Sequence, residues 1–330
     1  MIENNEIFNI TNNDFESTAI AIYQYQYQNI PIYKAYADAV HKTPQNVTNL
    51  LEIPFLPIQF FKSHPVIAKN CTPTITFESS GTTGSTSSKH YVQDIGIYEN
   101  SFTKCFELFY GDISQYCIVG LLPSYLERQH SSLVYMVDHL IKKSLHPNSG
   151  FYLYDLESLA KTLKENESQQ QPTLLIGVSY ALLDFSEQFA MPLQHTIIME
   201  TGGMKGRRKE LTKEQLHKQL QNSFSTSSIH SEYGMTELLS QAYAKENLLF
   251  QTPSWMKIIP RAIDNPLEIL NLPSHNEPIM GAINVIDFAN INSCSFIATD
   301  DIGKCYADGS FEVLGRLENS DIRGCGLMIV

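Results

Sequence analysis

Apolar residues recur at helical spacing near the start of the chain. Residues 15–28 carry this spacing, and Pro31 can open a second helix that runs to about residue 41. Two prolines within four positions exclude a regular helix over residues 53–58, so we expect this segment to cross the core in an extended form.

The middle of the chain alternates between strand-length apolar blocks and helix-length segments. We expect strands at residues 74–77, 116–122, 151–154, 173–178 and 195–199. We expect helices at residues 95–109, 131–141, 156–163 and 212–221, the last with Thr212 as its N-cap. Strands separated by helices predict a mainly parallel sheet that is covered on both faces.

The pattern changes after residue 255, where short strand-length segments predominate. Residues 282–288 and 295–298 predict strands, and Asp308 with Gly309 predicts a turn. We therefore expect an α/β fold with mainly parallel sheets, flanking helices and a small antiparallel, barrel-like part.

Composition narrows the class of protein. The chain has 330 residues and 43% hydrophobic content, which suffices for a sizeable core. Its formal net charge of -12 disfavours a general nucleic-acid binder, because an acidic chain repels phosphate backbones. The sequence lacks a run of about 18 apolar residues that would span a membrane, and its polar, acidic start is unlike a signal peptide. We expect a soluble cytoplasmic protein.

The cysteines are scattered, and none forms a Cys-x-x-Cys pair. This spacing argues against a zinc site, and the expected compartment argues against disulfides. We expect most of them to be buried apolar residues. The six are Cys71, Cys105, Cys117, Cys294, Cys305 and Cys325.

The strongest local signal is a segment rich in serine, threonine and glycine over residues 78–89, directly after an expected strand. Its glycines permit close backbone approach, its hydroxyl and N–H groups can donate to phosphate oxygens, and Lys89 adds positive charge. It is not a Walker A loop, because no Gly-Lys-Ser/Thr sequence closes it. A flexible surface linker is the alternative.

Three further segments carry weaker signals. Residues 231–237 combine Tyr233, whose ring can face a base, with Glu237, whose carboxylate can hold Mg²⁺ against a phosphate; a glycine turn is the alternative. Asp301 can accept hydrogen bonds from both ribose hydroxyls, although a plain β-turn also accounts for its surroundings. Residues 200–206 hold three glycines after an expected strand, which suits a close backbone wall or a simple loop.

Taken together and in this order, these segments resemble the superfamily of acyl-CoA synthetases, non-ribosomal peptide adenylation domains and luciferases. The matching segments are the phosphate-binding motif at 79–89, the adenine-side glycine segment at 201–206, the Tyr-Gly-x-Thr-Glu motif at 233–237, the ribose motif at 299–302 and the start of the hinge at 315–316. The ribose motif departs from the superfamily pattern, because Asp300 replaces a glycine.

Within that superfamily the chain most resembles the acyl-protein synthetase (LuxE-like) family of bacterial bioluminescence, over essentially its whole length. The stretches that carry this likeness are 53–62, 122–128, 200–203 and 323–325. The resemblance implies a large adenylate-forming domain over 1–316, a hinge remnant and tail over 317–330, and, within the domain, a helical and extended start at 1–70 and the antiparallel part at about 255–316.

The resemblance implies ATP-dependent activation of a fatty or aryl acid to an acyl-adenylate, with pyrophosphate release and with Mg²⁺ as cofactor. Members of the family then move the acyl group to one of their own cysteines near the C-terminus, here Cys325, and a reductase or carrier protein can receive it. Gly324 and Gly326 would let Cys325 swing, and Arg323 could lower its pKa. The alternative is that Cys325 packs in a final strand.

The resemblance also implies roles for individual residues. The β- and γ-phosphates would be held by Ser79, Ser80, Gly81, Thr82, Thr83, Gly84 and Lys89. Adenine would be flanked by Gly202, Gly203 and Tyr233, with Gly234 beside them. The α-phosphate and Mg²⁺ would be held by Thr236 and Glu237, with Thr83 as a further metal ligand. The ribose would be bound by Asp301, with Arg316 near it. His130 would lie beside the acyl pocket, unless it is a helix cap or a packing residue.

One departure from the superfamily affects the chemistry. Its usual mobile C-terminal domain carries a lysine that stabilises charge in the transition state, and this chain stops at Val330. We expect that Mg²⁺, Lys89, Lys205 or another local cation compensates, that adenylation is slow, or that a partner supplies the group. Two alternatives stay open: an acyl- or aryl-CoA or acyl-carrier ligase that uses a separate domain, and a non-catalytic nucleotide- or acyl-binding protein.

Overall fold

The computed structural model describes residues 6–80, 86–123, 127–202, 211–272 and 277–317. The described chain forms two compact units. The first unit consists of residues within Met1–Cys105, Gly234–Gln241 and Gln251–Ser320. The second unit consists of residues within Phe106–Tyr233 and Ala242–Phe250.

The first unit begins with a series of helices. They are η1 (Glu6–Asn9), α1 (Phe15–Asn29), α2 (Pro31–Ala39), η2 (Leu50–Glu52) and α3 (Phe60–Ser63), and α4 (Ile95–Tyr110) starts in this unit. Pro31 begins α2 after the extended Ile30, as the sequence predicted. Gln26 is fully buried and its Nε2 donates to the backbone oxygens of Asn290 and Ile291, which fixes α1 to the distal part of the chain.

The larger sheet of the first unit contains β1 (Leu56–Pro57), β10 (Met256–Arg261), β11 (Ile279–Asp287), β12 (Phe296–Cys305) and β13 (Phe311–Arg316). Its order is β1-β12-β11-β10, with β13 also paired to β12. All pairs are antiparallel except β1 with β12. The short helix η4 (Phe288–Asn290) follows β11, and a separate antiparallel hairpin joins β2 (Ile75–Glu78) to β3 (Lys89–Val92).

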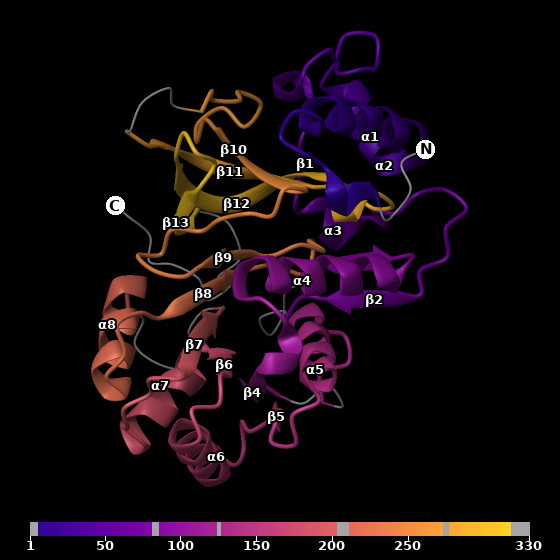
Figure 1. The fold of residues 1–330 in the computed structure, drawn as a ribbon. Helices are drawn as coiled ribbons and strands as arrows, with labels where there is room; N and C mark the ends of the chain where they lie inside the picture. Colours follow the sequence, from indigo (N-terminus) through magenta and orange to yellow (C-terminus); the bar gives the residue numbers. More distant parts are fainter. Residues whose placement is uncertain (1–5, 81–85, 124–126, 203–210, 273–276, 318–330) are drawn as a thin grey trace. The chain divides into compact units, whose positions relative to one another are not determined.

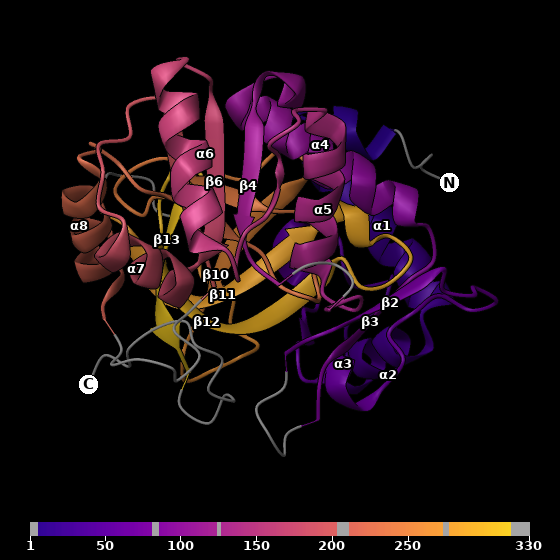
Figure 2. The same cartoon turned by 90° about the horizontal axis from the view of Figure 1, so that it is seen from below.

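The second unit contains a six-stranded sheet with the order β5-β4-β6-β7-β8-β9. Its strands are β4 (Cys117–Leu121), β5 (Gly150–Phe151), β6 (Thr173–Val178), β7 (Thr196–Thr201), β8 (His230–Tyr233) and the antiparallel edge strand β9 (Ala242–Ala244). Its helices are η3 (Ile113–Gln115), α5 (Ser132–Ser144), α6 (Leu156–Ser168), α7 (Ser179–Gln188) and α8 (Lys213–Phe224). Helix α5 packs against β4, and α7 against β6 and β7 (Figures 1 and 2).

Most of the predicted elements are confirmed. The parallel sheet is present, β6 has the predicted bounds, and Thr212 closes a capping box with Gln215 at the start of α8. The predicted strand over 151–154 is wrong beyond Phe151, because the chain turns there and Asp155 caps α6. Helix α7 and strands β3, β8, β9, β10 and β13 were not predicted.

The plain β-turn around Asp301 is also wrong. Strand β12 continues through Asp301 to Cys305, paired with β11 on one side and with β13 on the other. The sequence does not predict this part of the strand, because acidic residues and a glycine are typical of turns. In the structure its residues alternate between buried and half-buried over Thr299–Cys305. Within the described residues, no helix is both long and apolar enough to cross a membrane.

Candidate active site

The described ends of the serine- and threonine-rich segment are tied to each other. The backbone N–H of Ser79 donates to the Ser88 carbonyl at 3.0 Å, and the Ser88 N–H donates to the Ser79 hydroxyl at 2.9 Å. Lys89 Nζ lies 3.5 Å from Glu78 Oε1 across the β2–β3 hairpin. The described ends of the segment therefore lie between two paired strands; Gly81, Thr82, Thr83 and Gly84 lie outside the described residues.

His90, the residue after Lys89, links this hairpin to the segment 231–237, which contains Glu237. It is fully buried, with Nδ1 at 2.9 Å from the Thr236 carbonyl oxygen and Nε2 at 2.8 Å from Ser293 Oγ. Because a carbonyl only accepts, Nδ1 carries the proton and Nε2 accepts from the Ser293 hydroxyl. Burial lowers the pKa of His90 to about 4, so the ring is neutral near pH 7.

His90 was missed in the sequence, although a signal for it exists. In the short strand β3, His90 and Val92 are buried on one face, while Lys89 is exposed on the other. A polar residue at an inward strand position is expected to have a specific partner. The partner Thr236 lies 146 residues further along the chain, so the sequence gives no means of naming it.

Buried side chains from the end of β11 and from η4 hold the backbone around Glu237. Asn290 Nδ2 donates to the Glu237 carbonyl oxygen at 2.8 Å, and Asp287 Oδ2 accepts from the N–H groups of Leu239 and Ser240 at 2.9 Å. Burial raises the pKa of Asp287 to about 6, although these donors favour its ionised form. Glu237 itself is fully buried, and its backbone position is fixed from both sides.

The predicted ribose residue lies on β12 in the same unit. Asp301 is 3% exposed, and its Oδ1 lies 3.2 Å from Arg316 Nε on the neighbouring strand β13. The Asp301 N–H donates to Thr299 Oγ1, and the buried Arg261 donates to the Thr299 carbonyl. The structure thus brings the two predicted residues, Asp301 and Arg316, into direct contact.

Asp300, which replaces the glycine of the superfamily motif, has a partner in a distant stretch. Gln59 Nε2 donates to Asp300 Oδ1 at 2.5 Å. Gln59 belongs to residues 53–62, one of the stretches that carries the family resemblance. The acidic side chain therefore links the ribose motif to this N-terminal stretch.

In the second unit, Gly202 and Tyr233 lie at the carboxyl ends of the adjacent parallel strands β7 and β8. Gly202 has a φ of +70°, which favours glycine, while Gly203 lies outside the described residues. Tyr233 is 8% exposed, and its ring packs edge-on against Phe250 with centroids 5.9 Å apart. Carboxyl ends of parallel strands are where open α/β sheets bind ligands.

A buried acid, Glu232, also lies near these carboxyl ends. Thr201 Oγ1 donates to Glu232 Oε2 at 2.5 Å, between neighbouring positions of β7 and β8. Burial raises the pKa of Glu232 to about 7. A buried carboxyl group with a raised pKa at the carboxyl ends of parallel strands is a candidate functional group.

His130 and the described cysteines are weaker candidates for reactive groups than the residues above. His130 is exposed in the turn before α5, whose N-cap is Ser131, so the helix-cap alternative is wrong, and its place beside an acyl pocket stays a prediction. Cys105, Cys117, Cys294 and Cys305 are buried as predicted, Cys71 is half-buried, and Cys325 lies outside the described residues. Burial raises the pKa of Cys294 and of Cys305 to about 12, so these thiols are poor nucleophiles.

Several solved structures share this fold at low sequence identity. ATP-bound MatB from Rhodopseudomonas palustris is 13% identical with a TM-score of 0.54 over 75% of this chain and 48% of that chain. A double mutant of o-succinylbenzoate CoA synthetase (MenE) from Bacillus subtilis, bound with its product analogue OSB-NCoA, is 17% identical with a TM-score of 0.52 over 76% and 50%. The same synthetase in complex with AMP is 15% identical, with a TM-score of 0.50 over 77% and 64%.

These likenesses define the class of fold, which is that of the N-terminal domain of adenylate-forming enzymes. The chain spans about half the length of the first two structures. It belongs to the family described as "Acyl-protein synthetase, LuxE", whose model matches residues 10–330, and this confirms the resemblance found in the sequence. No curated protein sequence matches the chain.

Proposed function

We propose that the chain activates a fatty or aryl carboxylic acid with ATP and then transfers the acyl group to a thiol. The observation that carries this proposal is the hydrogen bond between His90 and the Thr236 carbonyl. This bond ties the strand that leaves the serine- and threonine-rich loop to the backbone beside Glu237, within one unit. Phosphate donors and a metal-binding carboxylate must lie close together to act on one triphosphate. The family membership supports the same chemistry.

In the proposed reaction, a carboxylate oxygen of the acid attacks the α-phosphorus of ATP. The bond from that phosphorus to the bridging oxygen breaks, and pyrophosphate leaves. Loop residues 79–84 and Lys89 hold the β- and γ-phosphates, and Asp301, oriented by Arg316, binds the ribose. Gly202 and Tyr233 flank the adenine.

The donor set fits a magnesium ion. Mg²⁺ is usually held by one or two carboxylates together with substrate phosphates, and the buried Glu237 offers one carboxylate on a fixed backbone. Thr83 is the proposed second ligand. When bound, Mg²⁺ neutralises developing charge on the phosphates.

The second step needs a thiolate. A thiolate attacks the carbonyl carbon of the acyl-adenylate, the carbon–oxygen bond to phosphate breaks, and AMP leaves. We propose Cys325 as this nucleophile, with onward transfer to a reductase or carrier protein. Among the described thiols the pKa of each buried cysteine at positions 117, 294 and 305 is raised, which disfavours them for this role.

The test of acid activation is ATP–pyrophosphate exchange with a panel of fatty, aryl and hydroxy acids. Exchange that depends on one class of acid is the expected result. Absence of exchange with every acid, together with intact ATP binding, would favour the non-catalytic binding protein. Loss of exchange in Glu237→Ala is expected, and wild-type exchange in that variant contradicts the metal assignment.

The test of acyl transfer uses a labelled acid of the class that supports exchange. The label is expected to stay on denatured protein and to be lost in Cys325→Ser, while Cys71→Ser retains it. Label that appears only on added CoA or carrier protein favours the ligase alternative.

A further inference from the structure

A buried carboxylate outside the proposed reaction joins four elements of the second unit. Glu200 lies on β7, and its side chain is 1% exposed. Lys213 Nζ, from the first turn of α8, lies 2.6 Å from both of its oxygens. Ser231 Oγ, from β8, donates to Oε1 at 2.8 Å, and Ser179 Oγ, at the start of α7, lies 3.2 Å from Oε2.

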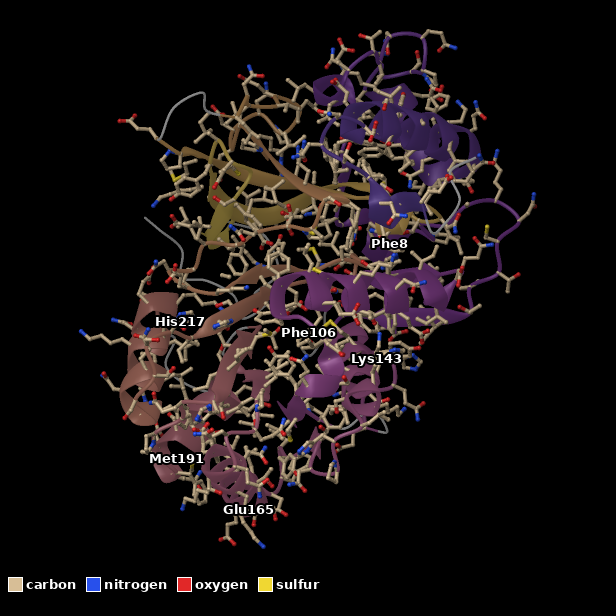
Figure 3. All side chains as sticks on the ribbon, viewed as in Figure 1. Phe8, Phe106, Lys143, Glu165, Met191 and His217 are labelled. Atoms are coloured by element: carbon tan, nitrogen blue, oxygen red, sulfur yellow. The ribbon has the colours of Figure 1, made fainter. Side chains whose placement is uncertain are left out.

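A histidine completes this cluster. His217 lies one turn after Lys213 on α8 and is labelled in Figure 3. Its Nε2 lies 3.2 Å from Ser231 Oγ and 3.6 Å from Glu200 Oε1. Because the Ser231 hydroxyl gives its proton to Glu200, His217 donates from Nε2. We call Glu200, Lys213, His217, Ser231 and Ser179 the Glu200 cluster.

The carboxylate of this cluster is charged. Burial alone opposes ionisation of Glu200, but Lys213 and His217 outweigh it and lower its pKa to about 2. A buried ion pair is a weak argument for stability, because desolvation offsets much of the attraction. Such pairs are better attested as devices that fix one arrangement.

The cluster reaches two residues assigned to the adenine. Ser179 Oγ lies 2.5 Å from the Gly202 carbonyl oxygen, so one hydroxyl is shared between that carbonyl and Glu200. Gly202 has positive φ, and this hydrogen bond fixes the direction of its carbonyl. Ser231 is two residues before Tyr233 on β8. One carboxylate therefore contacts both strands just before their carboxyl ends.

We propose that Glu200, buried between Lys213, Ser179 and Ser231, is a positioning residue that holds Gly202 and Tyr233 in the arrangement that binds adenine. This inference rests on the proposed function, because it assumes that these two residues flank the adenine of ATP. It assigns Glu200 no contact with the reacting atoms. Its loss is therefore expected to weaken nucleotide binding more than the chemical step.

The main variant is Glu200→Gln, which keeps the shape of the side chain and removes its charge. A hydrogen bond to a charged group contributes enough that we expect the KM for ATP to rise about tenfold in pyrophosphate exchange. At saturating ATP the rate is expected to stay within about threefold of the wild type, because uniform binding alone is lost. Calorimetric titration should show the same loss of affinity for ATP.

Two ligands separate positioning of the adenine end from a general loss of structure. Adenosine contains the adenine and inorganic tripolyphosphate does not. Glu200→Gln is expected to weaken adenosine binding as much as ATP binding and to leave tripolyphosphate binding unchanged. A variant whose affinity for tripolyphosphate falls by the same factor has lost structure generally, and that result overturns the proposal.

Lys213 provides a rescue test. Lys213→Met is expected to weaken ATP binding, and Lys213→Arg to restore it, because arginine keeps the ion pair with Glu200. Ser179→Ala keeps the ion pair and removes only the hydroxyl at the Gly202 carbonyl, so we expect a smaller loss of affinity. If Glu200→Gln fails to fold, these variants decide: ATP affinity within twofold of the wild type in both Lys213→Met and Ser179→Ala overturns the proposal.

Glu167, on α6, provides the matched control, because its carboxylate binds the start of β7, at the opposite end of that strand from Gly202. Its carboxylate accepts from the N–H groups of Gln194 and His195 and from the Thr196 hydroxyl, at the start of β7. Glu167→Gln is expected to lower stability and leave the KM for ATP unchanged. If the wild-type protein binds neither ATP nor adenosine, the proposed function fails together with this inference. If the wild type binds ATP and Glu200→Gln binds it with the same affinity, only this inference fails.

Discussion

At the residue scale, His90 shows how one buried side chain links distant segments. Its neutral ring donates to Thr236 and accepts from Ser293, and these three residues come from three separated parts of the chain. The sequence predicted the loop and Lys89 from local composition, but the partners of His90 depend on how β3 packs. Local patterns carry no information on such pairings.

The first prediction concerns replacement of His90. His90→Ala removes the partner of the half-buried Thr236 carbonyl and the nearer partner of the buried Ser293 hydroxyl, so we expect a loss of about 1–3 kcal/mol in the free energy of unfolding. Pyrophosphate exchange is expected to fall as well, because the backbone beside Glu237 loses one support. Urea denaturation measures the first effect. The exposed His64→Ala is the control, and an equal loss in both variants contradicts this role.

The second prediction concerns the pH dependence of stability. The pKa of His90 is about 4 in the folded protein and 6.5 ordinarily, so the unfolded chain binds more protons between these values. The contribution of His90 to stability is therefore present above pH 6.5 and is lost as the pH falls towards 4, by about 3 kcal/mol.

Glu232 and Asp287 have raised pKa values, so they change stability with pH in the opposite direction to His90. Because both residues are present in wild type and in His90→Gln, the difference in stability between the two proteins isolates the contribution of His90. The stability difference between the two proteins should shrink as the pH falls from 7 to 4. A constant difference over that interval contradicts the burial of a neutral ring.

At the scale of elements, most of the longer helices and the parallel strands β4, β6 and β7 were predictable because their signals are local. Thr212 and Gln215 form a capping box within four residues, and β6 is a continuous apolar run. Strand β12 was cut short in the prediction because Asp300, Asp301 and Gly303 look like a turn. Their burial comes from pairing with β11 and β13, which the sequence does not reveal.

The third prediction uses a glycine of that strand. A Cβ added at Gly303 would lie 2.2 Å from the Glu312 carbonyl oxygen and 2.7 Å from the Ile283 side chain. Gly303→Ala must therefore displace β13 from β12, at an expected cost of about 1–3 kcal/mol or more. Because Arg316 lies on β13, the KM for ATP should rise too.

The control for this variant is another strand glycine. A Cβ at Gly150 meets its nearest neighbour, Tyr152, at an ordinary 3.7 Å. Gly150→Ala is expected to stay within about 0.5 kcal/mol of the wild type. Thermal unfolding of the two variants side by side checks the prediction, which fails if Gly303→Ala is as stable as Gly150→Ala.

At the scale of the whole molecule, family and fold were both predictable, because four ordered motifs constrain the chain more than any one of them. What the sequence could not supply is the set of contacts that support those motifs, such as Gln59 with Asp300 and Lys213 with Glu200. Each of these pairs joins separate elements, and only the folded chain brings them together.

The fourth prediction follows from the proposed use of ATP. A ligand that binds only the folded protein stabilises it, by about 2.7 kcal/mol at a hundredfold excess over Kd. Thermal unfolding should therefore shift upwards with ATP and Mg²⁺, and EDTA should reduce the shift. Glu237→Ala is expected to show little of the magnesium-dependent part. An EDTA-insensitive shift in the wild type contradicts the proposed metal site.

The division of the chain into two units has a practical consequence. The described chain passes from one unit to the other at Cys105–Phe106, Tyr233–Gly234, Gln241–Ala242 and Phe250–Gln251. No single cut in the gene can separate the two, since at every crossing at least one of the two resulting fragments carries pieces of both units. Attempts to express either unit as one continuous fragment should give aggregated product, and a protease that nicks one loop should leave two fragments that copurify.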